Sequence, residues 1–347
     1  MKYINLNSTN ILDNIRHQKG NRALKDYVLE EIRKDKTGIL KLLNDEDLQF
    51  ASLFILVPEI KKLGLADELN GRNQNALDII DRIALKKSLQ TKAYDDFLIN
   101  ASDKNGPVKS CPHRKQVSYP ALKWIITTGF QDDGLCDQYD QIVDTAAIYL
   151  VTKYKESTIL PILIELCFKR YKNDEYYSDL VWAFFESREI NCLYMIAQKF
   201  LSRQKEDVAF ANKLLRFIPG ISQYSLNGIR CYAAFKKWFT ENSPFLYYTG
   251  ENFQQTCHPA PFEVDREAKY LCKIVSARNG KPLKPYSQNE LALLDRFHQL
   301  SAETKKLISD FSYIMNRQNF YWWNQWIQSP IDQQIKTAVT MSGGFVC

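Results

Sequence analysis

Cysteine and histidine, the residues best suited to hold a transition metal, fall together at only two places in the sequence. Cys111 and His113 lie in SCPHRK, and Cys257 and His258 lie in TCHPAP. Two thiolates and two imidazoles are a ligand set that suits tetrahedral zinc, so these four residues form the candidate metal site. Their spacing is not that of a zinc ribbon, and adjacent Cys and His ligands are awkward in geometry. The alternative interpretation is two ordinary loops, and no cofactor is expected.

Positive charge gathers in two segments without acidic residues, which makes them a candidate phosphate-binding site. The segments are 104–123 and 269–284, with five basic residues each. The side chains proposed to hold phosphate are Lys109, Arg114, Lys115, Lys273, Arg278 and Lys281. If both segments shared a face, they could contact a nucleic-acid backbone, because such contacts need charge but no base readout. Separate solvated loops are the other interpretation.

The familiar catalytic motifs are absent from the sequence. It has no G-x-S-x-G, P-loop, H-E-x-x-H or glycine-rich dinucleotide turn, and only four histidines. Acid–base chemistry needs only groups that are close in space, so catalysis is not excluded. Asp179 and Trp182 lie three residues apart in YYSDLVWAFF, where one helix face could direct both into a groove. Asp179 is therefore the candidate catalytic residue.

The composition is that of a globular protein with a sizeable core. Of 347 residues, 45% are hydrophobic and 25% are charged, and the net charge is +6. Only 13 glycines occur, and this scarcity favours helices because β-rich folds need many glycine-containing turns. We expect no signal peptide and no membrane span, since the longest apolar runs fall far short of about 20 residues. Eight cysteines without a C-x-x-C pair lead us to expect a reduced, cytoplasmic protein.

Helical periodicity dominates the chain and divides it into three regions. An N-terminal helical region, 1–118, ends in a long polar loop. Five consecutive amphipathic helices with short links fill most of the middle region, 119–220. The last region, 221–347, is expected to be a C-terminal helical subdomain that includes an irregular stretch at 242–263 and ends in a short apolar tail.

Several helix ends are predicted from capping residues. One helix is expected over 22–43, and Gly64 should end the next one. Pro120 is expected near the first position of a helix, where its missing N–H does no harm. Ser287 and Glu290 have the spacing of a capping box.

The middle region contains a repeated pattern. The helix pair from Ser157 and the pair from Glu189 superpose at a spacing of about 32 residues, so that ILPILIELCFKR aligns with NCLYMIAQKFLSR. A long apolar helix, a basic turn, an acidic N-cap and a second helix recur. This pattern resembles HEAT and armadillo-like repeats, and a plain helical bundle would also fit it. The resemblance implies an all-α fold, a solenoid-like array of antiparallel helix pairs with a concave binding face. Some HEAT-like proteins are DNA glycosylases, which implies a lesion-facing role for Asp179.

Three of the six tryptophans lie in one short stretch, NFYWWNQWI at 319–327. On a helix, Phe320, Ile327 and the three tryptophans fill an arc of about 160°. A base-stacking platform would interleave aromatic and basic residues, and none of the latter lies between Arg317 and Lys336. We predict an aromatic packing face, mostly core, of which part could be a docking surface.

The function that these observations favour is a non-catalytic helical scaffold or adaptor. It would bind a protein or peptide through aromatic anchors, for which the candidates are Trp182, Phe185, Tyr247 and Tyr248. One alternative is a protein that binds the phosphate backbone of a nucleic acid, and the most specific form of this alternative is a HEAT-like DNA glycosylase. Another is a structural component of a larger assembly, in which the apolar tail inserts into a neighbouring chain.

Overall fold

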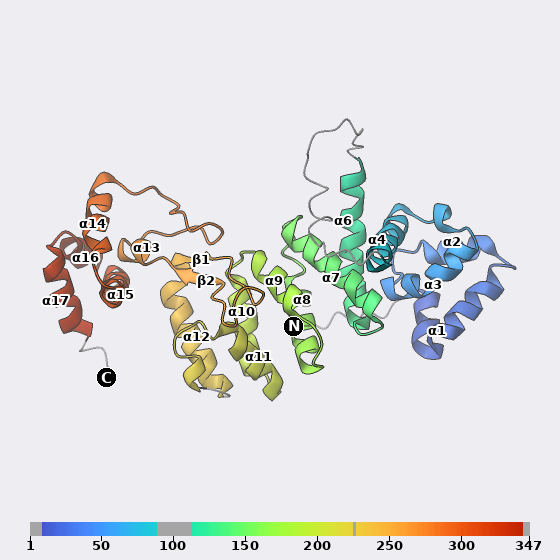
Figure 1. Ribbon diagram of the computed structural model, residues 1–347, viewed down its shortest axis with the longest axis horizontal. Helices are drawn as coiled ribbons and strands as arrows, with labels where there is room; N and C mark the ends of the chain where they lie inside the picture. Colours follow the sequence, from blue (N-terminus) through green and yellow to red (C-terminus); the bar gives the residue numbers. More distant parts are fainter. Residues whose placement is uncertain (1–8, 89–112, 225–226, 343–347) are drawn as a thin grey trace. The chain divides into compact units, whose positions relative to one another are not determined.

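The computed structural model describes residues 9–88, 113–224 and 227–342, with the side chains of 85–88, 113–118 and 342 excepted. These ranges contain sixteen α-helices and one two-stranded ribbon, which confirms the predicted all-α class. Two compact units divide the chain, Met1–Leu166 and Cys167–Cys347. Figure 1 shows the order of their elements. Within the described ranges, no helix combines the length and apolar character that crossing a membrane requires.

The first unit is built from six helices and the start of a seventh. They are α1 (Ile11–Glu31), α2 (Lys36–Leu43), α3 (Phe50–Lys62), α4 (Gly71–Ser88), α6 (His113–Gly129), α7 (Asp137–Thr152) and α8 (Leu160–Lys172), the last of which continues into the second unit. α6 packs against α3, α4 and α7, and α1 packs against α2 and α3. Phe50 lies at their centre, where its ring stacks on Tyr139 at 5.3 Å and meets Trp124 edge-on at 5.6 Å between centroids.

Two predicted helix boundaries in this unit are wrong, and capping residues explain one of them. The expected helix over 22–43 is two helices, because the Asp35 side chain accepts the N–H of Gly38 and starts α2 afresh. Pro120 lies inside α6 and does not begin it. Gly64 does follow the end of α3, with φ at +63°, a conformation that glycine adopts without strain.

The second unit begins with the end of α8 and continues through four more helices. They are α9 (Ser178–Glu186), α10 (Asn191–Gln198), α11 (Lys205–Leu215) and α12 (Gly228–Asn242). Together with α7 and α8, the first three are the five helices that periodicity predicted. Cys167 and Cys192 are fully buried, where cysteine packs as a small apolar residue.

A short ribbon follows α12 in the stretch that was expected to be irregular. β1 (Leu246–Tyr248) pairs antiparallel with β2 (Phe262–Val264), and Leu246 lies opposite Val264. Leu246, Phe262 and Val264 are buried while Glu263 is exposed, which is the alternation of a strand with one covered face.

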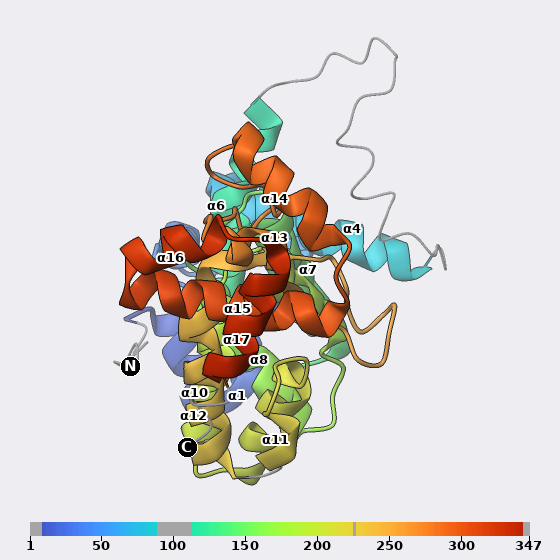
Figure 2. The same ribbon diagram turned by 90° about the vertical axis from the view of Figure 1, so that its left-hand side faces the viewer.

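Five helices complete the chain and share one apolar core. They are α13 (Arg266–Tyr270), α14 (Gln288–His298), α15 (Ala302–Gln318), α16 (Phe320–Ile327) and α17 (Ile331–Ser342). Figures 1 and 2 show these helices grouped together, and α15 contacts α13, α16 and α17. Tyr270 stacks on Phe297 at 4.7 Å in their core. The predicted capping box of Ser287 and Glu290 is present at the start of α14.

The tryptophan-rich helix α16 packs with only part of its apolar arc. Trp326 and Ile327 are 6% and 2% exposed, and the indole N–H of Trp323 donates to Ser312 Oγ at 2.8 Å. Phe320 and Trp322, which periodicity assigned to the same packing face, are 65% and 44% exposed. No neighbouring element of the described structure covers the first turn, so it belongs to the part of the face that the sequence analysis left open as a docking surface.

Candidate partner-binding surface

The residues proposed to hold zinc do not form a site in the described part of the chain. Cys257 is exposed, and the ring Nδ1 of His258 lies 2.9 Å from Arg216 Nη1. Cys111 is outside the described residues, as is the side chain of His113. Among the side chains that the structure does describe, no group of three potential ligands gathers around a common point.

The phosphate-binding candidates of the second basic segment are largely engaged with carboxylates. Lys273 pairs with Glu290 at 2.9 Å and Arg278 pairs with Glu189 at 3.0 Å, while Lys281 is exposed without an ion pair in the described ranges. Of the first segment, Lys109 is outside the described residues, and so are the side chains of Arg114 and Lys115.

The candidate catalytic aspartate serves as a hydrogen-bond acceptor within the second unit. Asp179 Oδ1 accepts from the Tyr176 hydroxyl at 2.9 Å and from Gln254 Nε2 at 2.7 Å. These bonds fasten the loop between β1 and β2 to α9. Trp182 is half-buried on the same helix. This arrangement gives the Asp179 carboxylate a structural role as the acceptor that ties two segments together.

The other predicted aromatic anchors are held by intramolecular contacts. Phe185 is 5% exposed and packs against Phe262 in the core. The Tyr248 hydroxyl donates to Glu186 Oε2 at 2.6 Å, and burial together with this carboxylate raises the pKa of Tyr248. Burial and the nearby Glu263 carboxylate raise the pKa of Tyr247 to about 12. These rings therefore stabilise the fold around β1.

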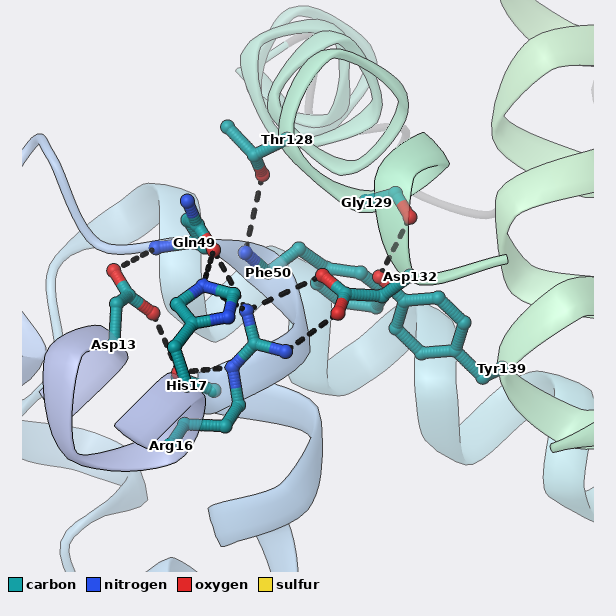
Figure 3. Close-up of polar contacts among 10 residues, drawn as sticks. Asp13, Arg16, His17, Gln49, Phe50, Thr128, Gly129, Asp132 and Tyr139 are labelled. Carbon is teal, nitrogen blue, oxygen red and sulfur yellow. Dashed lines mark hydrogen bonds and ion pairs between the residues drawn. The ribbon is translucent and has the colours of Figure 1, made fainter. Parts of the chain in front are cut away.

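A buried polar network in the first unit is a further place where chemistry could occur (Figure 3). Arg16 Nη1 and Nη2 lie 2.5 Å and 3.2 Å from the Asp132 carboxylate, and Nε donates to Ser52 Oγ at 3.0 Å. Arg16 Nη2 also donates to Gln49 Oε1 at 2.7 Å, and Asp13 accepts from Ser52 Oγ and from the Gln49 backbone N–H. Every charged group is matched by a partner, so the network ties α1 to α3 and to the turn after α6.

His17 borders that network at the surface. Its Nε2 lies 3.0 Å from Arg16 Nη2 and 3.1 Å from Gln49 Oε1. These two contacts attach His17 to the same Arg16 and Gln49 side chains that tie α1 to α3.

The excess positive charge of the chain lies entirely in the second unit. Residues 167–347 contain 23 basic and 17 acidic side chains, a net of +6, whereas residues 1–166 contain 23 of each. A partner that is attracted by charge would therefore be drawn to the second unit.

A basic groove runs between α12 and α15 in that unit. It encloses about 640 Å³ and is lined by Ala233, Lys236, Lys237, Thr240, Glu241, Tyr313, Ile314, Arg317 and Gln318. Three of these side chains are cationic and one is acidic. None of the three cations has an ion pair with a carboxylate in the described part of the chain, and all three side chains are exposed to solvent. Their positive charge is therefore available to a ligand.

The groove has a rigid floor made of aromatic and buried polar groups. The Tyr313 ring packs edge-on against Phe245 at 5.1 Å, and the Arg317 guanidinium lies 5.6 Å from its centroid. Beneath it, Lys269 is 1% exposed and its Nζ donates to Asn242 Oδ1 at 2.7 Å and to Asp310 Oδ1 at 2.5 Å. Burial lowers the pKa of Lys269, and the Asp310 carboxylate opposes that shift. These two hydrogen bonds from Lys269 join Asn242 of α12 to Asp310 of α15 and hold the two helices together.

The exposed face of α12 extends this surface beyond the groove. Ile229, Ala233, Lys236, Lys237 and Thr240 fall within an arc of about 100° on the helix. Ile229 is 76% exposed and lines a second hollow of about 720 Å³, which also includes Arg203 and Lys205. The opposite face of α12 is buried through Cys231 and Phe235. The helix therefore presents an exposed isoleucine near its start and two exposed lysines in its second half.

The uncovered first turn of α16 begins beside the end of the groove. Gln318 lines the groove and Phe320 starts α16 two residues later, so their Cα atoms are at most about 7 Å apart. Phe320, Tyr321 and Trp322 are 65%, 71% and 44% exposed. We call the exposed face of α12, the groove and these three aromatic residues the α12–α15 surface.

Sequence reasoning did not find this surface, because its parts are far apart in the chain. No basic residue follows Arg317 within the tryptophan stretch, but Lys236 and Lys237 reach the same groove from a helix about 80 residues earlier. The feature that could have indicated it is the sequence of α12, in which Ile229, Lys236 and Lys237 are spaced so that they fall on one face of a helix.

No family model matches the chain, and no curated protein or solved structure shows a significant similarity to it.

Proposed function

We propose that this protein is a helical scaffold that binds a protein partner through the α12–α15 surface. The observation that carries the proposal is the exposure of three consecutive aromatic side chains, Phe320, Tyr321 and Trp322, on a helix that buries its last two residues. Exposed aromatic rings beside a groove are the residues that most often carry binding energy at protein interfaces. A partner that covered them would remove this apolar area from water at little cost in side-chain entropy.

The proposed architecture behind this surface is a solenoid-like array of antiparallel helix pairs. What supports it is the regular succession of helices, in which α8 and α10 begin 31 residues apart and α9 and α11 begin 27 residues apart. α10 packs against α11 and α12. In such an array each helix pair buries one face against its neighbours and leaves another for partners.

Site-specific photo-crosslinking tests the proposed function. A photoreactive phenylalanine analogue replaces Tyr321, and a matched control carries it in place of Tyr176, which is 61% exposed in the same unit. In the cells that make the protein, we expect a discrete adduct at position 321 that resists nuclease and disappears with protease. A nuclease-sensitive adduct would favour the nucleic-acid alternative, and an adduct with a second copy of the chain would favour self-assembly. Equal adducts at both positions would refute a specific surface.

A further inference from the structure

Resting on that proposed function, we infer that the partner presents an acidic amphipathic helix, which lies along α12 with its carboxylates on Lys236, Lys237 and Arg317. The inference adds the chemistry of the partner to the proposed binding surface. It depends on the distribution of charge and apolar side chains on that surface, and on its length.

The charge of the groove selects for an acidic ligand. Lys236 and Lys237 project from α12 and Arg317 from α15, so cations lie on both walls, against the single carboxylate of Glu241. Uncompensated cations on the two walls of a concave site raise the local concentration of negative ligands. Arg317 can also hold a carboxylate through two parallel hydrogen bonds. A carboxylate between the walls would thus be met from two sides.

The apolar side chains of the surface select for a ligand that is amphipathic. Ile229 is 76% exposed at one end of α12, and Ile314 is 37% exposed on the wall of the groove. Phe320, two residues after Gln318 of the groove lining, is 65% exposed. A ligand with only charged groups would leave these three side chains in water, whereas leucine or phenylalanine residues of a helix would cover them.

The length of the surface suits a helix better than a nucleic acid. From Ile229 to Thr240 the face of α12 spans eleven residue steps, about 16 Å, which matches three turns of a partner helix. A nucleic-acid strand carries a phosphate on every nucleotide and is held by a continuous basic track. Here the three groove cations lie on the second half of α12 and the end of α15 with Glu241 among them, and Arg203 and Lys205 belong to the separate hollow beside Ile229.

The test is a binding titration with three labelled probes on the full chain. The first probe is a synthetic helical peptide with glutamate and leucine at amphipathic spacing. The second has the same composition with its leucines moved off the apolar face, and the third is single-stranded oligothymidine. Fluorescence anisotropy at low and at moderate salt gives each affinity.

Two matched charge reversals locate the site. Lys236→Glu with Lys237→Glu removes two groove cations, and Lys281→Glu with Lys284→Glu changes the net charge equally at exposed residues of the same unit. We expect the amphipathic peptide to bind most tightly and to weaken with salt. The first variant should lose about tenfold or more in affinity, and the second less than about threefold. Circular dichroism and gel filtration confirm that both variants fold.

Four results would overturn the inference. They are tighter binding of oligothymidine, equal binding of the two peptides, equal losses in the two charge-reversal variants, and absence of any peptide binding. Because the crosslinking at Tyr321 uses no acidic probe, a protein adduct there would leave the proposed scaffold function standing even if this inference failed.

Discussion

Replacement of Arg16 by methionine is the perturbation whose effect on stability follows most directly from the structure. Methionine keeps the apolar stem but removes the guanidinium, whose contacts join α1 to Asp132, Ser52 and Gln49. The Arg16 side chain is 6% exposed and that of Asp132 18%, so the carboxylate loses its partner in a site that water reaches only in part. Breaking a buried ion pair costs about 3–5 kcal/mol. The partial exposure of Asp132 places the expected loss at about 3 kcal/mol.

Hydrogen exchange of the full chain is the appropriate assay, because it localises the loss. Backbone amides of α1 and α3 that exchange through opening of this packing should do so roughly 100-fold faster, since about 1.4 kcal/mol corresponds to tenfold. Arg22→Met is the matched control on α1, because that side chain is 96% exposed and lies 3.9 Å from Asp26. It should change stability by less than about 0.5 kcal/mol.

A double variant separates the lost pair from simple damage to packing. Adding Asp132→Leu to Arg16→Met removes the orphaned carboxylate and should recover part of the stability. A loss below about 1 kcal/mol for Arg16→Met would refute the view that this network holds the first unit together. Equal exchange rates in the Arg16 and Arg22 variants would do the same.

Three further predictions concern other parts of the chain. Hydrogen bonds from Thr158 and Tyr119 lower the pKa of Glu156 to about 2 from 4.5, so its stabilisation is present above pH 4.5 and lost as the pH falls towards 2. Urea unfolding at a series of pH values should therefore show a loss about 2 kcal/mol larger over that range than in Glu156→Gln, where the other carboxylates still titrate. Gly228→Ala places a Cβ in overlap with the Phe200 carbonyl oxygen and should cost about 2 kcal/mol or more in urea unfolding. Gly71→Ala should cost little, because its Cβ meets nothing within 4 Å. Trp326→Ala should cost about 3–5 kcal/mol in the same assay and Trp322→Ala less than about 1 kcal/mol, because the first ring is buried and the second is not.

The helices and their buried faces were predictable from sequence because both depend on local periodicity. The five middle helices formed where the apolar repeat placed them, and Trp326 and Ile327 turned inward as the helical projection required. Helix starts were less predictable. Asp35 restarts a helix in a stretch whose apolar residues alone read as continuous, so a single cap decided the boundary.

The candidate surface was not predictable because it depends on which neighbours cover each helix. Periodicity assigns Phe320 to the apolar side of α16 but does not reveal that the packing helices stop short of its first turn. Likewise, the pairing of Arg278 with Glu189 joins residues 89 positions apart and removes a cation that sequence assigned to phosphate. Contacts between residues so far apart cannot be predicted from the local sequence around either residue.

Hydroxyl-radical footprinting of the complex with the acidic amphipathic peptide tests the central claim most directly. Aromatic side chains react according to their exposure, and Tyr321 at 71% and Tyr176 at 61% provide a site and a control in the same unit. If the α12–α15 surface is the partner interface, saturating peptide will protect Tyr321 and Trp322 and leave Tyr176 unchanged. Protection of Tyr176 with continued oxidation of Tyr321 and Trp322 would contradict the account.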